Sequence, residues 1–357
     1  MTRLRVALVA CTNVIGGHEF QAAALAKSLA EHVPVTVFVN HSEHVKVFED
    51  VGLEIRVAEG VLLERGPLPK QLLNGWCRRT EIRSLVEGFD HVIVSAGAVE
   101  AGVAVGLALQ GRRRSLSMYL PSFYDRVPLW GWKGHLYNGA LGAACRLFAF
   151  IITINRIQAR VIRAFSGVPT LVVTNRIRQV HLSAEQGPSR LIFVGRMDQQ
   201  KRIGELMHWL DSDLNPFNEL LLIGDGPLRQ LLERQALELK HLNCIFLGWL
   251  KPEDQDHLIR TTDVLMLNSL IEGEPLVVRE ARARSMNILV REIVGTRGIT
   301  SRKERFSSQK ELLNRLSDMA ITIKSFEIGA AAKKTQRVNK MREINIMSLL
   351  GVMAKTQ

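Results

Sequence analysis

The sequence predicts an α/β protein made of two doubly wound, parallel-sheet domains. Short apolar runs alternate with helical patterns along the first half of the chain, and the alternation restarts near Leu191. Such alternation is typical of βαβ units, in which helices cover a parallel sheet. A length of 357 residues suits two domains, and a composition of 46% hydrophobic but only 6% aromatic residues suits buried strands rich in Val, Ile and Leu.

The first domain is expected to span residues 1–183. Its first strand is the apolar run Val6–Ala10, which is too short for the apolar region of a secretory signal peptide. Phe20–Leu29 then places apolar residues near a 3.6-residue period and predicts a helix. Further strands are expected at five later apolar runs, namely Val33–Val39, Val92–Ser95, Leu116–Leu120, Phe150–Ile154 and Leu171–Thr174.

The second domain is expected to span residues 184–325, after a polar linker at residues 181–190. Residues 326–357 are expected to be helical, and they could cap the second domain or cross back onto the first. A membrane-spanning helix needs about 20 apolar residues, and the longest apolar run, residues 136–154, is interrupted by Asn138 and Arg146, so none is predicted. The five predicted strands of the second domain are Leu191–Val194, Leu220–Ile223, Cys244–Leu247, Val264–Leu267 and Ile288–Val290.

The four cysteines, Cys11, Cys77, Cys145 and Cys244, are far apart in the sequence. They form neither a CxxC pair nor a spacing that ligates metal ions. We therefore expect reduced thiols in the core of a cytosolic protein. We also expect no metal site and, independently of the cysteines, no bound cofactor.

The positive charge is concentrated in one part of the chain. The net charge is +12, and residues 101–190 contain twelve Lys and Arg residues against only Asp125 and Glu185, an excess of ten positive charges. A face of this kind attracts anionic lipid, nucleic acid or a phosphorylated substrate, and it can also be a solvated basic surface. Nucleic-acid binding is disfavoured because no nucleic-acid motif is present and the aromatic series stops at Trp130 and Trp132.

A glycine pair, Gly16-Gly17, lies between the first predicted strand and the first predicted helix. Glycines at this point let backbone N–H groups approach an anion at the N-terminus of a helix. The surrounding residues 15–20 do not form a GxGxxG pattern, which disfavours a nicotinamide cofactor.

Two cations follow the first strand of the second domain. Arg196 lies at the predicted strand end and Lys201 five residues later, at the start of the next helix. Ligands of open α/β sheets bind at this carboxyl edge. Two cations there could hold a diphosphate and stabilise it as a leaving group without a metal ion, although they could also be ordinary surface charges.

Residues 263–281 combine a strand, a short acidic loop and a helix. The loop carries Glu272 and Gly273, Pro275 fits the first turn of the helix, and Glu280 lies about 7.5 Å further along it. The helix start offers free N–H groups to a phosphate or a sugar hydroxyl. Glu280 could accept hydrogen bonds from a ribose diol, and Glu272 could bind sugar hydroxyls or offset positive charge at the anomeric carbon.

These features resemble, in order, the motifs of glycosyltransferase family 4, the glycosyl transferases group 1 domain of GT-B enzymes. The motifs cover Leu191 to Ile299, while Gly16-Gly17 is similar to the family's N-terminal glycine loop and Val172–Asn175 to the end of its first domain. The matching residues are Gly195-Arg196 with Lys201, Gly224-Asp-Gly-Pro227, Leu247-Gly-Trp249, the E-x7-E signature from Glu272 to Glu280, and Val294-Gly295-Thr296.

The resemblance implies a GT-B fold, in which two Rossmann-like domains face a central cleft. It implies that Arg196 and Lys201 hold the diphosphate, that Glu280 binds the ribose and that Glu272 contacts the transferred sugar. The backbone around Trp249 would face the base, and Gly16-Gly17 would close over the phosphates. Glu272, Arg196 and Lys201 are thus expected to be catalytic, and the donor site is completed by Gly248, Gly273 and Leu276.

The sequence departs from the family pattern at several positions. Glu274 occupies a position that is often apolar, and Arg282-Ala-Arg284 replaces a run of small residues. The histidine that the family often carries on a strand end of the first domain is missing from Ser117–Phe123. His18, directly after the glycine pair, is similar to the catalytic base of a different, inverting GT-B group. The E-x7-E pattern implies retention of anomeric configuration, and His18 is the candidate base for inversion or else a packing residue.

We therefore expect a glycosyltransferase that moves a sugar from a UDP-, GDP- or ADP-sugar to a glycan or lipid-linked acceptor, in cell-surface polysaccharide or lipopolysaccharide-type synthesis. The resemblance implies that it is metal-independent. The alternatives are a GT-B-like nucleotide-sugar epimerase, a non-catalytic basic protein that binds a membrane surface, and an inactive transferase.

The resemblance to GT-B enzymes implies that the first domain, which contains the arginine-rich part of the chain, selects the acceptor. Arg156, Arg160 and Arg163 are spaced four and three residues apart, which places them on one helix face, and Trp130 and Trp132 precede them. Arginines beside such apolar residues suit an interfacial membrane patch. The expected location is cytoplasmic, with peripheral docking on the inner face of the membrane as a hypothesis. The rival interpretation is a soluble, negatively charged acceptor.

Overall fold

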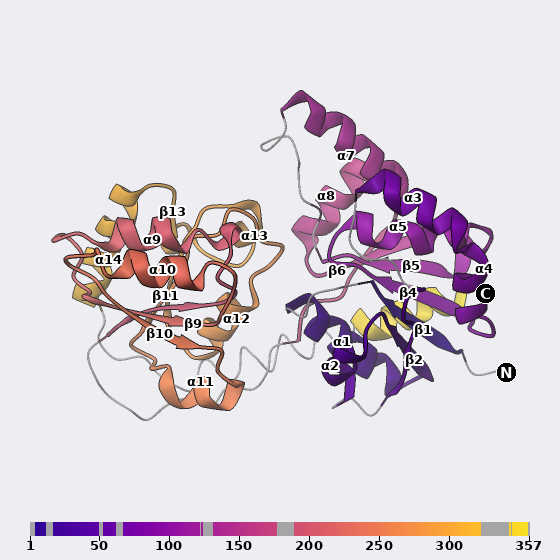
Figure 1. Cartoon of the computed structure of the whole chain (residues 1–357), viewed down its shortest axis with the longest axis horizontal. Coiled ribbons are helices and arrows are strands. Elements are labelled where there is room, and N and C mark those ends of the chain that lie inside the picture. The colour runs from indigo at the N-terminus through magenta and orange to yellow at the C-terminus, as the bar shows by residue number, and fades with distance from the viewer. Residues whose placement is uncertain are drawn as a thin grey trace. The chain divides into compact units, whose positions relative to one another are not determined.

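The computed structural model describes residues 4–11, 17–49, 53–61, 67–121, 123, 131–176, 189–322, 343 and 345–355. The chain forms two compact units (Figure 1). Unit 1 consists of Met1–Arg176 with Asn339–Gln357, and unit 2 of Ile177–Val338. Each unit is built on its own parallel sheet, so the predicted two-domain α/β fold is confirmed.

The sheet of unit 1 has, within the described residues, seven parallel strands in the order β3-β2-β1-β4-β5-β6-β7. Six of them correspond to predicted apolar runs. β3 was missed because it is a mostly exposed edge strand in which Glu54 and Arg56 form an ion pair. The strands are β1 (Val6–Ala10), β2 (Val35–Val39), β3 (Glu54–Val57), β4 (His91–Ser95), β5 (Leu116–Tyr119), β6 (Phe150–Thr153) and β7 (Thr170–Val172).

Helices cover both faces of this sheet. Successive β1 side chains point to opposite faces, so Val6 and Leu8 belong to one buried cluster and Ala7 and Val9 to the other. The Val6 side packs against α1 (Gly17–Ala30), α2 (Val45–Glu49) and residues 345–355, whose buried side chains are Ile346, Leu349 and Met353. The Ala7 side packs against α3 (Leu68–Cys77), α4 (Arg79–Leu85), α5 (Val99–Ala108), α7 (Trp132–Cys145) and α8 (Arg156–Ser166).

The sheet of unit 2 has six parallel strands among the described residues, in the order β10-β9-β8-β11-β12-β13. The order reverses between β8 and β11, and in doubly wound sheets such a switch point marks the ligand-binding edge. β13 is only two residues long and was missed for that reason. The strands are β8 (Leu191–Val194), β9 (Glu219–Ile223), β10 (Asn243–Gly248), β11 (Val264–Leu267), β12 (Asn287–Arg291) and β13 (Arg305–Phe306).

The helices of unit 2 surround an aliphatic core in which the central strands are almost fully buried. The principal helices are α9 (Ile203–Leu210), α10 (Arg229–Ala236), α11 (Pro252–Leu258), α12 (Leu276–Ala283), α13 (Val294–Arg297) and α14 (Gln309–Thr322), and the short 3-10 turn η3 (Gln199–Lys201) precedes α9. None of the helices within the described residues is long and apolar enough to cross a membrane.

The expectation of core thiols is wrong for one cysteine. Cys11 and Cys145 are buried, and burial raises the pKa of each thiol to about 12. Cys244 is half-buried on the edge strand β10, and Cys77 is exposed at the end of α3. The spacing of cysteines along a sequence carries no information on which side of a helix each one faces.

A buried histidine begins β4. The Nε2 atom of His91 lies 2.9 Å from the hydroxyl of Ser117, and its ring stacks on Phe150 with a centroid distance of 5.6 Å. Burial lowers the pKa of His91 to about 4, so the ring is neutral at pH 7.

Candidate functional site

The candidate site of unit 2 begins in the turn after β8. The carboxylate of Asp198 accepts a hydrogen bond from the backbone N–H of Lys201 at 3.2 Å and so caps η3. The next residue, Arg202, has a left-handed conformation with a φ of 49°, which is unusual for a residue with a side chain. The turn therefore presents Lys201 at the carboxyl edge of the sheet.

The loop after β11 is bonded directly to this turn. The backbone N–H of Leu270 donates to the carbonyl of Gln200 at 2.8 Å, and the Gln200 side chain donates to the carbonyl of Ile271 at 2.7 Å. The Lys201 ammonium then forms an ion pair with the carboxylate of Glu272. Both side chains are largely buried, with 17% and 11% exposed. The fold thus brings two predicted site residues, 71 positions apart in the sequence, into contact.

Arg196 differs from Lys201 in its surroundings. Its Nε atom lies 3.9 Å from the carboxylate of Asp198, and half of its side chain is exposed, at 51%. A Coulombic contact at this distance and exposure is weak. Arg196 therefore remains available to an anion, whereas the charge of Lys201 is balanced by Glu272.

The loops after β8, β9 and β10 approach one another through glycines. A Cβ atom added to Gly224 would lie 2.0 Å from the carbonyl oxygen of Gly195, so only glycine fits there. The backbone N–H of Met197 donates to the carbonyl of Asp225 at 2.8 Å, and that of Gly224 donates to the carbonyl of Gly248 at 2.7 Å. The predicted motifs at Gly224–Pro227 and Gly248 thus provide the backbone contacts between the loops that follow β8, β9 and β10.

Trp249, which follows β10, has 67% of its surface exposed. Its neighbour Gly248 has a φ of 70°, in the left-handed region that favours glycine. The indole is therefore held at the end of the strand, where a planar ligand group could stack on it.

The acidic segment leads into α12 as the sequence predicts. Pro275 is the N-cap of the helix rather than a residue of its first turn, and Leu276 is the first helical residue. Gly273 is buried, and Leu276 and Glu280 are half-buried. The unexpected Glu274 is buried and bound by the guanidinium of Arg279, which neutralises its charge.

The two arginines of Arg282-Ala-Arg284, another departure from the family pattern, also form ion pairs. Arg282 donates to the carboxylate of Glu304 at 2.7 Å, and Arg284 is bound to the carboxylate of Asp256 on α11, with both side chains almost fully buried. These arginines attach α12 to its neighbours. The small residues usual in the family have been replaced by side chains with a structural role.

The loop that carries Glu272 also touches the start of α13. A Cβ atom added to Gly295 would lie 2.0 Å from the carbonyl oxygen of Glu272. Position 295 must therefore be glycine, because any side chain there would clash with the backbone of Glu272, the candidate catalytic residue.

A polar network behind the site was not predicted. The Arg291 guanidinium donates to the side-chain oxygens of Asn268 at 3.0 Å and of Glu205 at 3.2 Å. The Asn268 amide donates to Glu205 at 2.8 Å and to the carbonyl of Arg202 at 3.2 Å. The network therefore holds the strained residue next to Lys201. The features of the sequence that could have indicated this network are the polar residue directly after β11, Asn268, and the one at the end of β12, Arg291.

Unit 1 carries the remaining predicted residues. Gly16 lies outside the described residues, and Gly17 is the first residue of α1. The His18 Nε2 atom lies 3.0 Å from the hydroxyl of Ser95, and the ring stacks on Tyr119 with a centroid distance of 5.5 Å. Ser95 and Tyr119 end β4 and β5, so His18 is at the carboxyl edge of this sheet. Burial lowers the pKa of His18 to about 4, and the imidazole is neutral at pH 7.

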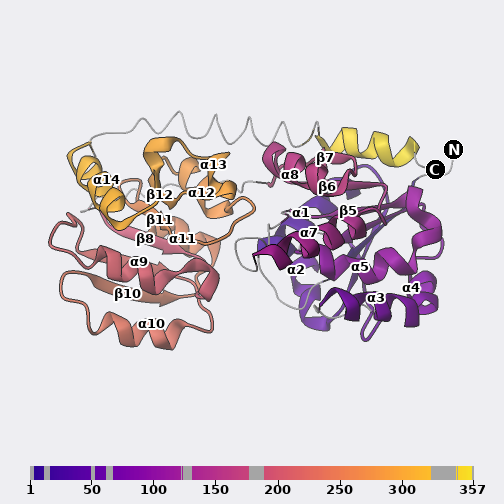
Figure 2. The same ribbon diagram turned by 90° about the horizontal axis from the view of Figure 1, so that it is seen from above.

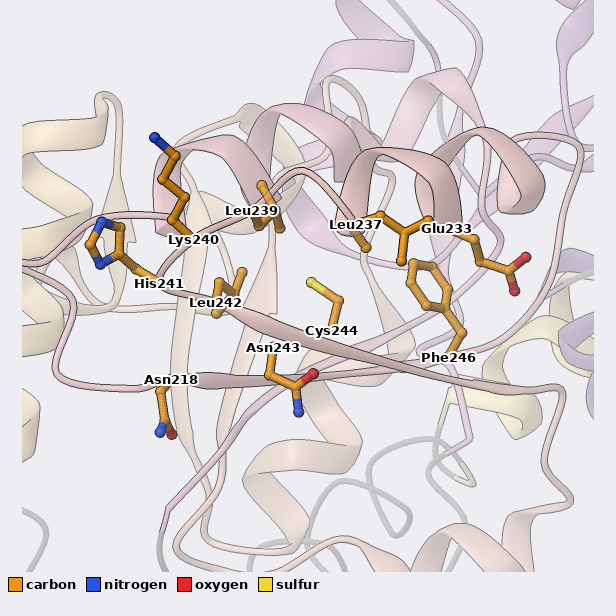
Figure 3. Close-up of a pocket in the computed structure, with 11 residues that line it drawn as sticks. Asn218, Glu233, Leu237, Leu239, Lys240, His241, Leu242, Asn243, Cys244 and Phe246 are labelled. Carbon is orange, nitrogen blue, oxygen red and sulfur yellow. The ribbon is translucent and has the colours of Figure 1, made fainter.

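A pocket of about 570 Å³ lies in another part of unit 2, and Figure 3 shows the residues that line it. It is lined by the end of α10, by the edge strand β10 and by the segment between them, with Lys240 and His241 on one side and Cys244 and Phe246 on the other. Its lining also includes Asn218 and Asn243, at the amino ends of the strands. The pocket includes none of the predicted donor residues, and those of unit 2 lie instead in and after the loops at the carboxyl edge of the sheet.

Residues 174–314 match the family described as Glycosyl transferases group 1. The predicted resemblance to the glycosyl transferases group 1 domain is therefore confirmed for this region. An uncharacterized glycosyltransferase of Methanocaldococcus jannaschii is 27% identical over 117 residues, which are 32% of this chain and 30% of that protein. The match thus spans less than a third of the length of this curated relative.

Solved structures share the fold of the whole chain. The lipopolysaccharide outer core galactosyltransferase WaaB has a TM-score of 0.71 at 15% identity, covering 99% of this chain and 100% of that one. Anabaena HepE in complex with UDP and glucose has a TM-score of 0.72 at 15% identity, with coverage of 99% and 100%. A Listeria monocytogenes protein described as a UDP-N-acetylglucosamine 2-epimerase has a TM-score of 0.59 at 14% identity, with coverage of 94% and 91%. The expected GT-B fold is confirmed, and the fold alone does not separate transfer from epimerisation.

Proposed function

We propose that the protein transfers a sugar from a nucleoside-diphosphate sugar, held by the group 1 domain of unit 2, to a glycan or lipid-linked acceptor. The observation that carries the proposal is the contact between Lys201 and Glu272 at the switch point of the sheet, with Arg196 on the same edge. A cation that could hold the diphosphate and a carboxylate that could contact the sugar are thereby brought together at one edge of the sheet.

The donor would lie along this edge. Arg196, Lys201 and the free N–H groups at the start of α12 would hold the diphosphate. These groups would stabilise the negative charge that develops on the departing diphosphate, and the reaction would then need no metal ion. Glu280 would accept hydrogen bonds from the ribose, and the exposed face of Trp249 would border the base.

Glu272 would have two functions in this scheme. In the free protein its carboxylate balances the ammonium of Lys201. When a diphosphate takes over the ammonium, the carboxylate would be released toward the hydroxyls and the developing positive charge of the sugar. Binding of the donor and activation of Glu272 would thus be one event.

His18 bears on the stereochemistry. General base catalysis is most efficient when the pKa of the base is near the working pH, and a pKa of about 4 makes His18 a weak base at pH 7. The retaining reaction that we propose rests instead on the E-x7-E pattern from Glu272 to Glu280. If the product has an inverted anomeric centre, His18 is the first candidate base, and its replacement by Ala would abolish turnover.

The first test is a thermal-shift screen against UDP-, GDP- and ADP-sugars, because a ligand that binds only the folded protein raises its melting temperature. UDP-glucose and UDP-galactose come first, since HepE was solved with UDP and glucose and WaaB is a galactosyltransferase. We expect the bound donor to protect the wild type and to lose most of its effect in Lys201→Met. The absence of a shift with every compound would refute the proposal.

Product analysis separates the remaining functions. A transferase consumes donor only with an acceptor, and nuclear magnetic resonance of the new linkage reports its anomeric configuration. A GT-B-like epimerase would convert the donor alone into its epimer. An inactive transferase or a purely basic surface protein would do neither, and unchanged turnover with a chelator would support the metal-independent reaction. A lipopolysaccharide-type or other cell-surface glycan acceptor on the cytoplasmic side is the acceptor class to test first.

A further inference from the structure

The outward face of α7 is apolar and exposed. Trp132 and Leu136 lie one turn apart and have 69% and 67% of their surface exposed. Gly139, Ala140 and Ala143 continue the exposed face along the helix. The stripe from Trp132 to Ala143 is about 16 Å long at 1.5 Å per residue. A single exposed apolar residue needs no explanation, but a stripe with a tryptophan at its end is typical of a binding face.

An arginine-rich helix packs directly against α7. A Cβ atom added to Gly142 of α7 would lie 2.2 Å from the carbonyl oxygen of Phe165 in α8, so the two helices are in close contact (Figure 1). Arg156, Arg160 and Arg163 of α8 are all exposed and, at spacings of four and three residues, share a helix face. The apolar stripe and the arginines therefore belong to one helical pair.

The arginines of α8 lie in a segment of the sequence that has no acidic residues. The sequence from Arg126 to Ala184 contains no Asp or Glu. Within the described part of the chain, no carboxylate forms an ion pair with the three arginines, and Arg163 donates only to the hydroxyl of Thr170, at 3.0 Å. The exposed apolar side chains of α7, Trp132 and Leu136, and the exposed arginines of α8, Arg156, Arg160 and Arg163, are together called the α7–α8 face here. This helical pair thus combines exposed apolar side chains with positive charge.

A second helix on the same side of the sheet has a similar composition. Leu73 and Trp76 of α3 have 63% and 62% of their surface exposed, and the guanidinium of Arg79 lies 4.7 Å from the centre of the Trp76 ring. α3 and α7 both pack against α5, as the two views in Figures 1 and 2 show. The helical layer on this side of unit 1 thus carries exposed tryptophans and cations on two of its helices.

The chemistry of the α7–α8 face matches an anionic lipid surface. Tryptophan and leucine favour the boundary between headgroups and acyl chains, while arginine binds lipid phosphates and keeps its aliphatic part in apolar surroundings. A protein partner for so positive a face would need a matching acidic surface, and a second copy would oppose arginine to arginine. We propose that the α7–α8 face docks unit 1 on an anionic phospholipid membrane. The proposal does not depend on the proposed glycosyl transfer, because it involves no donor residue.

The test is co-sedimentation of the full-length protein with vesicles at low and high salt. One set of vesicles contains phosphatidylcholine only, and the other contains phosphatidylcholine and phosphatidylglycerol in equal parts. We expect binding to the anionic vesicles at low salt, weaker binding at high salt, and no binding to phosphatidylcholine. Failure to bind the anionic vesicles, or equal binding to both kinds, would overturn the proposal.

Two variants assign the binding to the face. Trp132→Ser with Leu136→Ser removes the apolar part, and Arg156→Gln with Arg160→Gln and Arg163→Gln removes the charge. We expect the triple variant to lose about 100-fold in its partition coefficient, since each arginine near such a surface contributes several-fold. The double variant should bind at least tenfold more weakly. Wild-type binding by either variant would contradict docking through this face.

Matched controls come from unit 2. Leu214→Ser with Leu237→Ser removes two apolar side chains that are 67% and 87% exposed. Arg297→Gln with Arg302→Gln and Lys303→Gln removes three charges from another exposed surface. Both controls should bind vesicles as the wild type does, and a loss as large as that of the face variants would show that the surface as a whole is responsible. Near-native melting temperatures for all variants verify folding.

A spectroscopic readout separates insertion from surface attraction. Lipids brominated in the acyl chain quench tryptophan only when the indole reaches the apolar boundary. We expect this quenching in the wild type and a marked loss of it in Trp132→Phe. Equal quenching in both proteins would overturn the placement of α7. If the wild type instead dimerises without binding vesicles, the face serves a second copy and the proposal is wrong.

Discussion

Replacing Gly295 by alanine tests whether the position of Glu272 matters for turnover. A Cβ atom at residue 295 would lie 2.0 Å from the carbonyl oxygen of Glu272 and 2.6 Å from its carbonyl carbon. Real Cβ atoms essentially never approach other heavy atoms closer than 3.0 Å. Either the loop that carries Glu272 or the start of α13 must therefore move by about 1 Å.

The size of that movement sets the expected effect. A displacement of about 1 Å in a catalytic group can lower turnover about 100-fold, which corresponds to about 3 kcal/mol of transition-state stabilisation. Overpacking costs about 1–3 kcal/mol of folding stability, so the melting temperature should fall by several degrees. The affinity for UDP should change less, because Arg196 and the start of α12 would still hold the diphosphate.

The assay compares turnover of the donor found in the screen, calorimetric binding of UDP and the melting temperature. Gly351→Ala is the control, since this exposed helical glycine has nothing within 4 Å of an added Cβ atom. It should keep full turnover and be slightly more stable, because alanine is favoured over glycine in helices. Turnover within twofold of wild type in Gly295→Ala would refute the reasoning, whatever its melting temperature.

Three further predictions concern residues outside the donor site. Arg291→Met should lower turnover more than UDP affinity, because it releases the network that holds the turn next to Lys201, and Arg291→Lys should restore part of the loss. Asp256→Asn should destabilise the protein by about 3–5 kcal/mol in urea unfolding, since it removes the carboxylate charge that is paired with the buried Arg284, whereas a loss below 1 kcal/mol would contradict this role. The pKa of His91 is lowered by burial from 6.5 to about 4, so its contribution to stability is complete above pH 6.5 and falls as the pH drops toward 4. When the pH is lowered from 7 to 5, the free energy of unfolding of the wild type should therefore fall by about 2 kcal/mol more than that of His91→Leu. Urea unfolding at the two pH values measures this difference.

The sequence was sufficient to predict the strands that are buried and apolar. β3 was not predicted because an edge strand need not be apolar on both faces. β13 was not predicted because a strand of two residues is too short to show a hydrophobic pattern. The spacing of motifs also predicted which loops meet at the edge of unit 2. Loop positions follow from chain order in a parallel sheet, so Lys201 and Glu272 could be placed near each other before any contact was known.

The side-chain pairings could not be predicted in this way. Arg291 contacts Glu205 across 86 positions of sequence, and no local pattern indicates such a pair. Glu274 and Arg284 were interpreted as departures from the family because their buried partners, Arg279 and Asp256, are visible only in the folded chain. Buried charges persist where a partner of opposite charge lies within contact, and that partner is fixed by tertiary structure.

The helix at residues 345–355 has a consequence for how the protein is made. Its side chains Ile346, Leu349 and Met353 fill the core of unit 1 next to Val6 and Leu8. A ribosome therefore synthesises all of unit 2 before unit 1 can be completed. During that interval the nascent first unit carries an open apolar groove, which is the kind of surface that chaperones bind. A polypeptide that ended near residue 338 would keep this groove exposed permanently. The helix at residues 345–355 therefore completes the core of a domain whose first strand lies near the N-terminus.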